Sequence, residues 1–174
     1  PGEDLSGARI DRVHARFADV YATCATFETG DRATDSALGC VVPVMAAHEA
    51  GRPGAYRASP VYWTWGWDAM VHADAFALAG QPAGIRRMLD FLRETAHPEG
   101  GIMHAYNYGF AGTVKERLAP PTQLFYALLL LNYFSLTGDA ATRDRCLPLA
   151  RLVVDRALEM RRPGEALVRW YDMF

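Results

Sequence analysis

Apolar residues recur along the start of this chain at alternating spacings of three and four, which is the period of an amphipathic α-helix. The first stripe consists of Ile10, Val13, Phe17, Val20, Cys24 and Phe27. Ser6 precedes it as a candidate N-cap, and Thr29-Gly30-Asp31 follows it as a helix stop. The pattern predicts a helix that packs by one face only, so that residues 1–30 form a leading or linker helix.

A second helix is predicted after this stop, with Asp31 or Asp35 as its N-cap. Its stripe consists of Leu38, Val41, Val42, Met45 and Glu49. Pro43 falls inside the stripe, and a proline removes a backbone hydrogen bond from a helix interior. We therefore expect either a kink at Pro43 or a helix that begins there.

Four further helices are predicted, over residues 67–78, from Pro82 to Leu92, over 122–136 and over 139–160. The helix after Pro82 is apolar on one face and carries Arg86, Arg87 and Arg93 on the other, as a solvated face would. The helix over 122–136 contains four leucines in succession, Leu128 to Leu131, and is apolar on every side. Such a helix is expected to be buried between two layers, and the whole pattern predicts an all-α protein.

Tight turns alternate with long loops between these helices. The turns Thr29-Gly30-Asp31, Ala79-Gly80-Gln81 and Thr137-Gly138-Asp139 share a form, and their glycines recur at intervals of roughly 50 to 60 residues. The loops cover residues 50–66, 97–119 and 161 onwards. In a stack of helical hairpins the tight turns lie at one end and the long loops at the other, and binding sites form at the loop end.

The stretch from Val61 to Met70, VYWTWGWDAM, is the main candidate site. Four aromatic residues crowd against Asp68 in it: Tyr62, Trp63, Trp65 and Trp67. Aromatic faces cover the C–H faces of a pyranose while a carboxylate accepts hydrogen bonds from its hydroxyls, so the combination is typical of a sugar-binding site. The positive end of the predicted helix favours an ionised Asp68 in its first turn. The structural alternative is a hydrophobic staple at a helix start.

Composition narrows the function classes. The chain has 174 residues, of which 51% are hydrophobic, which suits one globular domain. A net charge of −2 gives no basic patch for nucleic acid, and no apolar run approaches the roughly 18 residues of a membrane span. Cys24, Cys40 and Cys146 lie at apolar helical positions, which predicts buried, reduced thiols and favours a cytoplasmic location. No histidine or cysteine spacing matches a metal site, so neither a metal nor a cofactor is expected.

Three motifs follow one another along the chain: YWTWGWD, then GGIMHAYNYG, then APPTQLFYALLLLNYFSLTGD. Together they resemble the catalytic domain of the (α/α)6-barrel glycosidases, closest to glycoside hydrolase family 63 and its trehalase and glucoamylase relatives. The resemblance covers roughly residues 27–160 and implies helical hairpins that form about half of an (α/α)6 toroid. Residues 1–174 would then be a single all-α unit, and the rest of the same polypeptide would complete the catalytic domain.

The resemblance also implies an activity, that of an inverting glycoside hydrolase acting on an α-glucoside or a related oligosaccharide. Asp68, with the tryptophans beside it, would bind the non-reducing glucosyl unit. The loop that carries His104 and Tyr106 would line the same pocket, and Trp170 would join it from the third loop. His104 has a second interpretation, because a histidine between Met103 and Ala105 is as often a packed core residue.

The catalytic pair is less well defined by the resemblance. The family's general-acid segment, E-S-G-x-D-N, is absent from this chain. By position, Glu165, Asp172 or a residue beyond Phe174 would hold the place of the acid, and the base would lie further along the polypeptide. An inverting mechanism needs two carboxylates on opposite faces of the sugar, far enough apart to admit a water.

Two other classes of function remain open. A non-catalytic, carbohydrate-binding helical-repeat module would recognise a sugar without turning it over. Another α/α toroid, such as a sugar epimerase or a terpenoid-processing enzyme, would differ in its catalytic groups. An epimerase would use His104 and His48 as its acid and base.

Overall fold

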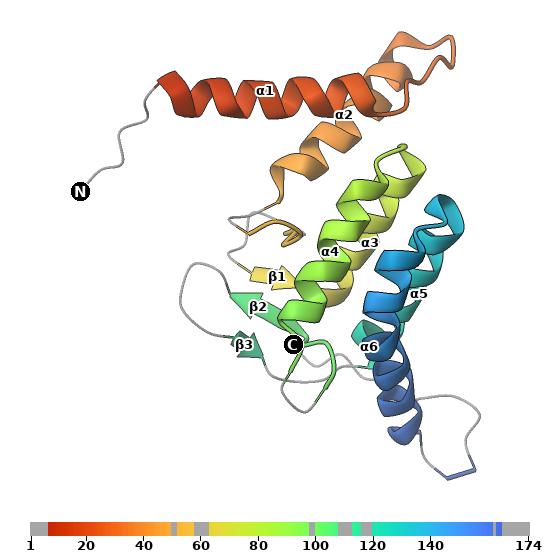
Figure 1. The fold of residues 1–174 in the computed structure, drawn as a ribbon. Coiled ribbons are helices and arrows are strands. Elements are labelled where there is room, and N and C mark those ends of the chain that lie inside the picture. Colours follow the sequence, from red (N-terminus) through yellow and green to blue (C-terminus); the bar gives the residue numbers. More distant parts are fainter. Residues whose placement is uncertain are drawn as a thin grey trace.

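The computed structural model describes residues 7–49, 52–57, 63–97, 100–107, 113–115, 120–161 and 163–164. Its helices are α1 (Gly7–Thr23), α2 (Arg32–Ala47), α3 (Gly66–Leu78), α4 (Pro82–Glu94), α5 (Pro120–Thr137) and α6 (Ala140–Glu159). Three short strands form one antiparallel sheet in the order β1 (Trp63–Trp65), β2 (Ala105–Asn107), β3 (Thr113–Lys115). The predicted all-α class is confirmed, and the small sheet is an addition that the hydrophobic pattern did not predict (Figure 1).

The first two helices follow the pattern with two differences. Helix α1 ends at Thr23, before the last residue of the predicted stripe, Phe27. Its stripe is only partly covered, because α1 reaches past the helices beneath it and leaves Ile10 and Val13 exposed (Figure 1). Helix α2 continues through Pro43, and its start is capped by Asp31, whose carboxylate accepts hydrogen bonds from the Ala33 and Thr34 amides at 3.2 Å.

The predicted tight turns are present, and each depends on a glycine with positive φ. Gly30, Gly80 and Gly138 have φ angles of 85°, 77° and 65°, a region that side chains with a Cβ rarely adopt. The turns between α3 and α4 and between α5 and α6 lie at the same end of the molecule, and the sheet lies at the other end of α3 and α4 (Figure 1). The two hairpins therefore present their loops together, as the alternation of turns and loops predicts.

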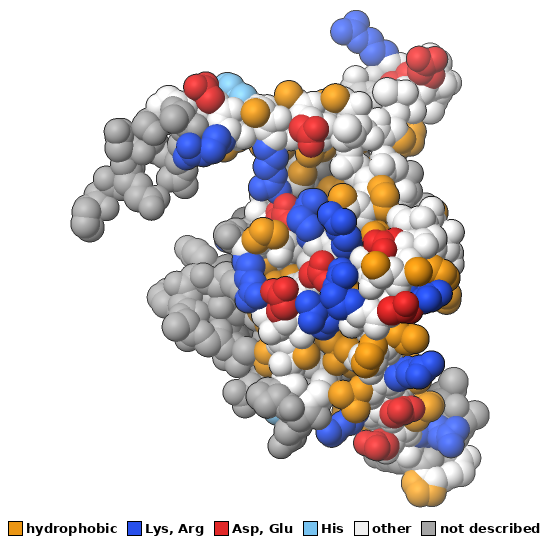
Figure 2. Space-filling model, viewed as in Figure 1, with side chains coloured by type: hydrophobic (Ala, Val, Ile, Leu, Met, Phe, Trp, Pro, Cys, Tyr) orange, Lys and Arg blue, Asp and Glu red, His pale blue; other side chains and the backbone are white. Residues whose placement is uncertain are grey.

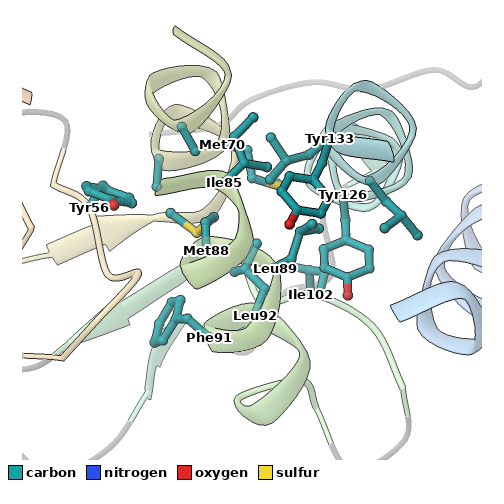
Figure 3. Packing of buried hydrophobic residues seen from close by; sticks show 14 of the residues in the cluster. Tyr56, Met70, Ile85, Met88, Leu89, Phe91, Leu92, Ile102, Tyr126 and Tyr133 are labelled. Carbon is teal, nitrogen blue, oxygen red and sulfur yellow. The ribbon is translucent and has the colours of Figure 1, made fainter. Parts of the chain in front are cut away.

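The core lies among α3, α4 and α5, which contact one another (Figure 3). Its largest fully buried side chains on these helices are Met70, Ile85, Met88, Leu89, Phe91, Leu92, Gln123, Tyr126 and Leu129. Helix α5 is not buried on every side: Leu129 and Leu130 are buried, whereas Leu128 and Leu131 are 47% and 59% exposed. The prediction was wrong for these two leucines, because no described segment covers that side of α5.

Ion pairs cover the outer face of α4 and α6 (Figure 2). The central group is Glu49, whose side chain is only 8% exposed. Its carboxylate lies 2.8 Å from Arg87 Nε and 2.5 Å from Arg16, and it accepts a hydrogen bond of 2.7 Å from the Gly54 amide. Arg87, predicted to be simply solvated, therefore joins α4 to Glu49 and, through the Tyr56 hydroxyl, to the 52–57 segment, while Arg16 joins α1 to the same Glu49.

The three cysteines are free but differ in exposure. Cys146 is buried on α6 against Tyr126, and burial raises the pKa of its thiol. Cys24 is half-buried, and Cys40 is exposed on α2. The prediction that all three are buried was wrong for Cys40, because the apolar residues of α2 do not all face the core.

The cap of α6 gives a test of this turn geometry. Asp139 accepts hydrogen bonds from the Thr142 amide (3.0 Å), the Thr142 hydroxyl (2.7 Å) and the Tyr133 hydroxyl (2.8 Å). These bonds, the Thr142 amide first, lower the pKa of Asp139 from 3.8 to about 2. Because the pKa of Asp139 is lower in the folded state than in the unfolded chain, its carboxylate stabilises the fold at pH values above 3.8. This stabilisation is lost as the pH falls from 3.8 towards 2.

We expect Asp139→Asn to lower the melting temperature by a few degrees at pH 7, since the amide replaces one accepting oxygen. The difference from the native protein should shrink as the pH falls from 3.8 to about 2. Thermal melts across this range measure it, with Asp155→Asn on the exposed side of α6 as the matched control. A difference that stays constant with pH would contradict the assigned cap.

Candidate functional site

The small sheet brings the two long loops together. Strand β1 follows the first loop and pairs in antiparallel register with β2 in the second, with Trp65 opposite Ala105. The loops are far apart in the sequence, and the register places Trp65 next to the residue that precedes Ala105, which is His104. Strand pairing therefore joins the tryptophan-rich stretch to the histidine loop.

Helices α3 and α5 hold the segment 102–104 from both sides. The Gly66 amide, at the start of α3, donates to the His104 carbonyl oxygen at 2.9 Å. Gln123, buried on the first turns of α5, forms two bonds with Ile102: its Oε1 accepts from the Ile102 amide at 2.7 Å, and its Nε2 donates to the Ile102 carbonyl at 2.5 Å. The Gln123 side-chain amide thus pairs with both backbone groups of Ile102, as the backbone of a neighbouring strand would.

Only glycine fits at position 66. A Cβ there would lie 2.7 Å from Thr122 Cγ2 on α5 and 2.8 Å from the Met103 carbonyl oxygen. Both distances are shorter than real Cβ contacts, and one of the atoms belongs to the backbone. The glycine in WTWGWD therefore allows strand β1, the histidine loop and α5 to approach closely.

Trp65 and His104 form the aromatic contact of the site. Their ring centroids are 5.1 Å apart and the rings are nearly perpendicular, at 84°. His104 is only 5% exposed, whereas Trp65 is half-buried and keeps part of its surface accessible. A T-shaped contact with a buried ring restricts the orientation of the indole.

Asp68 lies half-buried in the first turn of α3, as predicted. The free N–H groups at a helix start favour a carboxylate there. The Asp68 carbonyl oxygen lies 2.8 Å from His72 Nδ1, one turn further along the helix. Trp65, His104 and Asp68 are therefore the predicted residues that the structure gathers at the loop end of α3.

Two predicted binding residues lie elsewhere. Trp67 is 37% exposed and contacts Phe125 of α5, with ring centroids 6.1 Å apart. Tyr106 is buried: its ring contacts Phe91 at 5.2 Å, and its hydroxyl oxygen accepts from the Met103 amide at 3.2 Å. Burial raises the pKa of Tyr106 to about 12, which describes a core phenol with an internal partner.

Five predicted site residues are not described at the side-chain level. Strand β1 includes Trp63, of which the backbone alone is described. Tyr62, Glu165, Trp170 and Asp172 lie outside the described residues. The proposed acid candidates therefore stay predictions.

The sequence did not predict that two histidines, His48 and His72, lie close together. His48, after the end of α2, and His72 on α3 have ring centroids 6.4 Å apart at an angle of 81°. A His72 Nδ1–H donated to the Asp68 carbonyl would leave Nε2 to accept or release a proton. Within the part of the chain that the structure describes, no group pairs with the buried Nδ1 of His48. The four-residue spacing of Asp68 and His72 could have predicted their contact within one helix. The approach of His48 depends on tertiary packing and leaves no local pattern in the sequence.

Other site classes have less support. Among the described side chains, no three histidine, cysteine or acidic groups are arranged to hold a metal ion. Of the helices that the structure describes, none has the length and apolar character needed to cross a bilayer. Comparisons with protein families, curated proteins and solved structures found no match to this chain.

Gln123 offers a test of how the site is held. We expect Gln123→Leu to lower the free energy of unfolding by about 1 to 3 kcal/mol, because two buried backbone groups of Ile102 lose their partner. Hydrogen exchange should show faster exchange of the Ile102 amide, and denaturant unfolding gives the stability. The matched control is Gln81→Leu at the opposite end of α4, where exchange at Ile102 should stay slow. Equal exchange in both variants would contradict the role given to Gln123.

Proposed function

We propose that this chain supplies the sugar-binding wall of a glycoside hydrolase that acts on an α-glucoside or a related oligosaccharide. The observation that carries the proposal is the contact of Trp65 with His104 beside the Asp68 turn. These residues come from two distant loops, and a role confined to a helix start would not need the second loop. A partly accessible indole and a carboxylate at the start of one helix supply the two kinds of group that a neutral sugar ring requires.

In this proposal each residue has a separate role. The Trp65 indole stacks on the apolar face of the glycone, with His104 fixing its orientation. The Asp68 carboxylate accepts hydrogen bonds from the glycone hydroxyls, strengthened by its negative charge. Asp68 binds and does not transfer protons. The general acid is assigned by position to Glu165, Asp172 or a later residue, and with a distant base it would invert the anomeric carbon.

The toroid that this function needs would continue from α5 and α6. An apolar groove of about 340 Å³ lies between these helices, and its lining includes Leu130, Leu131, Leu147, Ala150 and Val154. Helices α3 and α4 meet α5 and α6 through a similar apolar surface. A further hairpin of the same polypeptide seated in the groove would extend the array towards an (α/α)6 barrel and cover Leu131 of α5.

A second candidate, histidine acid–base chemistry of the kind a sugar epimerase uses, is favoured by the pair His48 and His72. The rings lie close together, and His72 is oriented by the Asp68 carbonyl. Two imidazoles close together can remove a proton and return it. This alternative uses the same end of α3 but a different set of side chains.

Asp68→Asn tests the proposed binding role. The amide keeps the shape and loses the charge-assisted bonds, so transition-state binding should weaken by about 2 to 4 kcal/mol. Kinetics of the full-length polypeptide on a p-nitrophenyl α-glucoside measure this, with a thermal melt alongside and Asp155→Asn as the control. A melting temperature that falls while kcat/KM stays unchanged would make Asp68 a helix-start residue only. Loss of one limb of the pH profile would make it the acid or base.

His72→Gln, together with His48→Gln, separates the two candidate chemistries. Under the hydrolase proposal both variants keep their turnover within a few-fold, because neither imidazole transfers a proton. Under the epimerase alternative each removes an acid or base worth roughly 100-fold or more in rate. The readouts are glucoside hydrolysis and the exchange of a sugar C–H proton with deuterated water. Proton exchange that both variants abolish would overturn the hydrolase proposal.

A further inference from the structure

A small hollow lies between α3 and α5, apart from the Trp65 site. Its volume is about 180 Å³, below the roughly 300 Å³ at which sites for drug-sized ligands begin. Five of its lining residues are apolar and two are polar: Met70, Val71, Phe125, Leu128 and Leu129, with Asp74 and Asn132. The hollow is therefore an apolar cup that contains one charged group.

Asp74 and Asn132 form a pair across the hollow. The Asn132 Nδ2 group donates to both carboxylate oxygens, at 3.0 and 3.1 Å. Because a carboxylate only accepts, this contact also fixes which end of the amide is nitrogen. No described residue donates a hydrogen bond to the side-chain Oδ1 of Asn132. One Nδ2–H is shared between the two carboxylate oxygens and the second points away from them, so the acceptors of the pair are Oδ1 and the remaining lone pairs of Asp74.

The charge of Asp74 is not balanced by a cation among the described side chains. Three other carboxylates do have arginine partners: Glu49 with Arg87, Glu94 with Arg52, and Asp90 with Arg145. Asp74 is half-buried among apolar side chains and has an amide as its partner. A partly desolvated charge of this kind is stabilised by an opposite charge that enters the same hollow.

We propose that this hollow binds a small organic ammonium ion with an apolar or aromatic substituent. An ammonium group has three donors and a positive charge, which complement the lone pairs and the negative charge of the Asp74 carboxylate. A hydroxyl offers a single donor and no charge. The Phe125 ring, held against Trp67, adds a face that attracts cations, and the aliphatic side chains cover the substituent.

The ammonium site is independent of the proposed sugar site. Asp68 and Asp74 are six residues apart on α3, which turns them about 240° relative to each other at 100° per residue. Trp67, Val71 and Asp74 follow one another at helical spacing on the side of α3 that meets Phe125. Failure of sugar binding would therefore leave this proposal standing, and the reverse also holds.

Calorimetric titration of the full chain with 2-phenylethylammonium tests the proposal, with 2-phenylethanol as the neutral ligand of the same skeleton. We expect saturable binding of the amine at least tenfold tighter than that of the alcohol, and a preference that weakens with added salt. Asp74→Asn should abolish the preference, and Asp155→Asn should keep it. A folded Asp74→Asn protein that still prefers the amine would overturn the proposal.

The titration of the native protein is a test that needs no variant. Equal affinity for amine and alcohol, or no saturable binding of the amine, would overturn the ammonium site.

A separate measurement, light scattering at the titration concentration, shows whether a second copy of the chain covers the hollow. A dimer that Asp74→Arg dissociates would mean that a second copy covers the hollow, and this too would overturn the proposal.

Discussion

The segment from Ile102 to His104 is the part of the structure on which the arrangement of the site depends. It runs through the interior without belonging to a helix, so its backbone groups need partners from elsewhere. Helix α3 supplies the Gly66 amide and α5 supplies the Gln123 side chain. Because each bond ends on the same short segment, the starts of the two helices are fixed relative to each other. The register of β1 with β2, and with it the contact of Trp65 with His104, follows from that spacing.

A second constraint operates at Glu49, where a charge is partly removed from water. Glu49 is nearly buried, and two arginines and a backbone amide satisfy its carboxylate. Breaking one partner of such a group leaves an uncompensated charge, so the cluster favours one arrangement of α1, α4 and the 52–57 segment. Asp74 on α3 has no arginine partner among the described residues and lies in an apolar hollow beside an amide, which is why the proposed ligand site is placed there.

The sequence predicted the features whose causes are local. Helical periodicity identified α3 to α6 closely, and the caps at Asp31 and Asp139 and the glycine turns appeared where residue chemistry requires them. Features with non-local causes were missed. The three strands are too short for a pattern of their own and exist because two loops pair. The exposure of Leu128 and the burial of Tyr106 depend on what packs beside them, and the meeting of His48 with His72 depends on how α2 approaches α3.

The dense motif WTWGWD shows how one stretch of sequence is divided between two surfaces. Before Gly66 the chain is extended and paired, so Trp65 is directed by the sheet towards His104. After Gly66 it is helical, and each residue turns by about 100°, so Trp67 reaches Phe125 while Asp68 occupies a different side of α3. The helix then repeats the division, with His72 on the side of Asp68 and Asp74 on the side of Trp67. The change from strand to helix at Gly66 thus divides aromatic residues that are adjacent in the sequence between two places. Trp65 lies at the loop end with His104, and Trp67 lies against Phe125, which lines the hollow between α3 and α5.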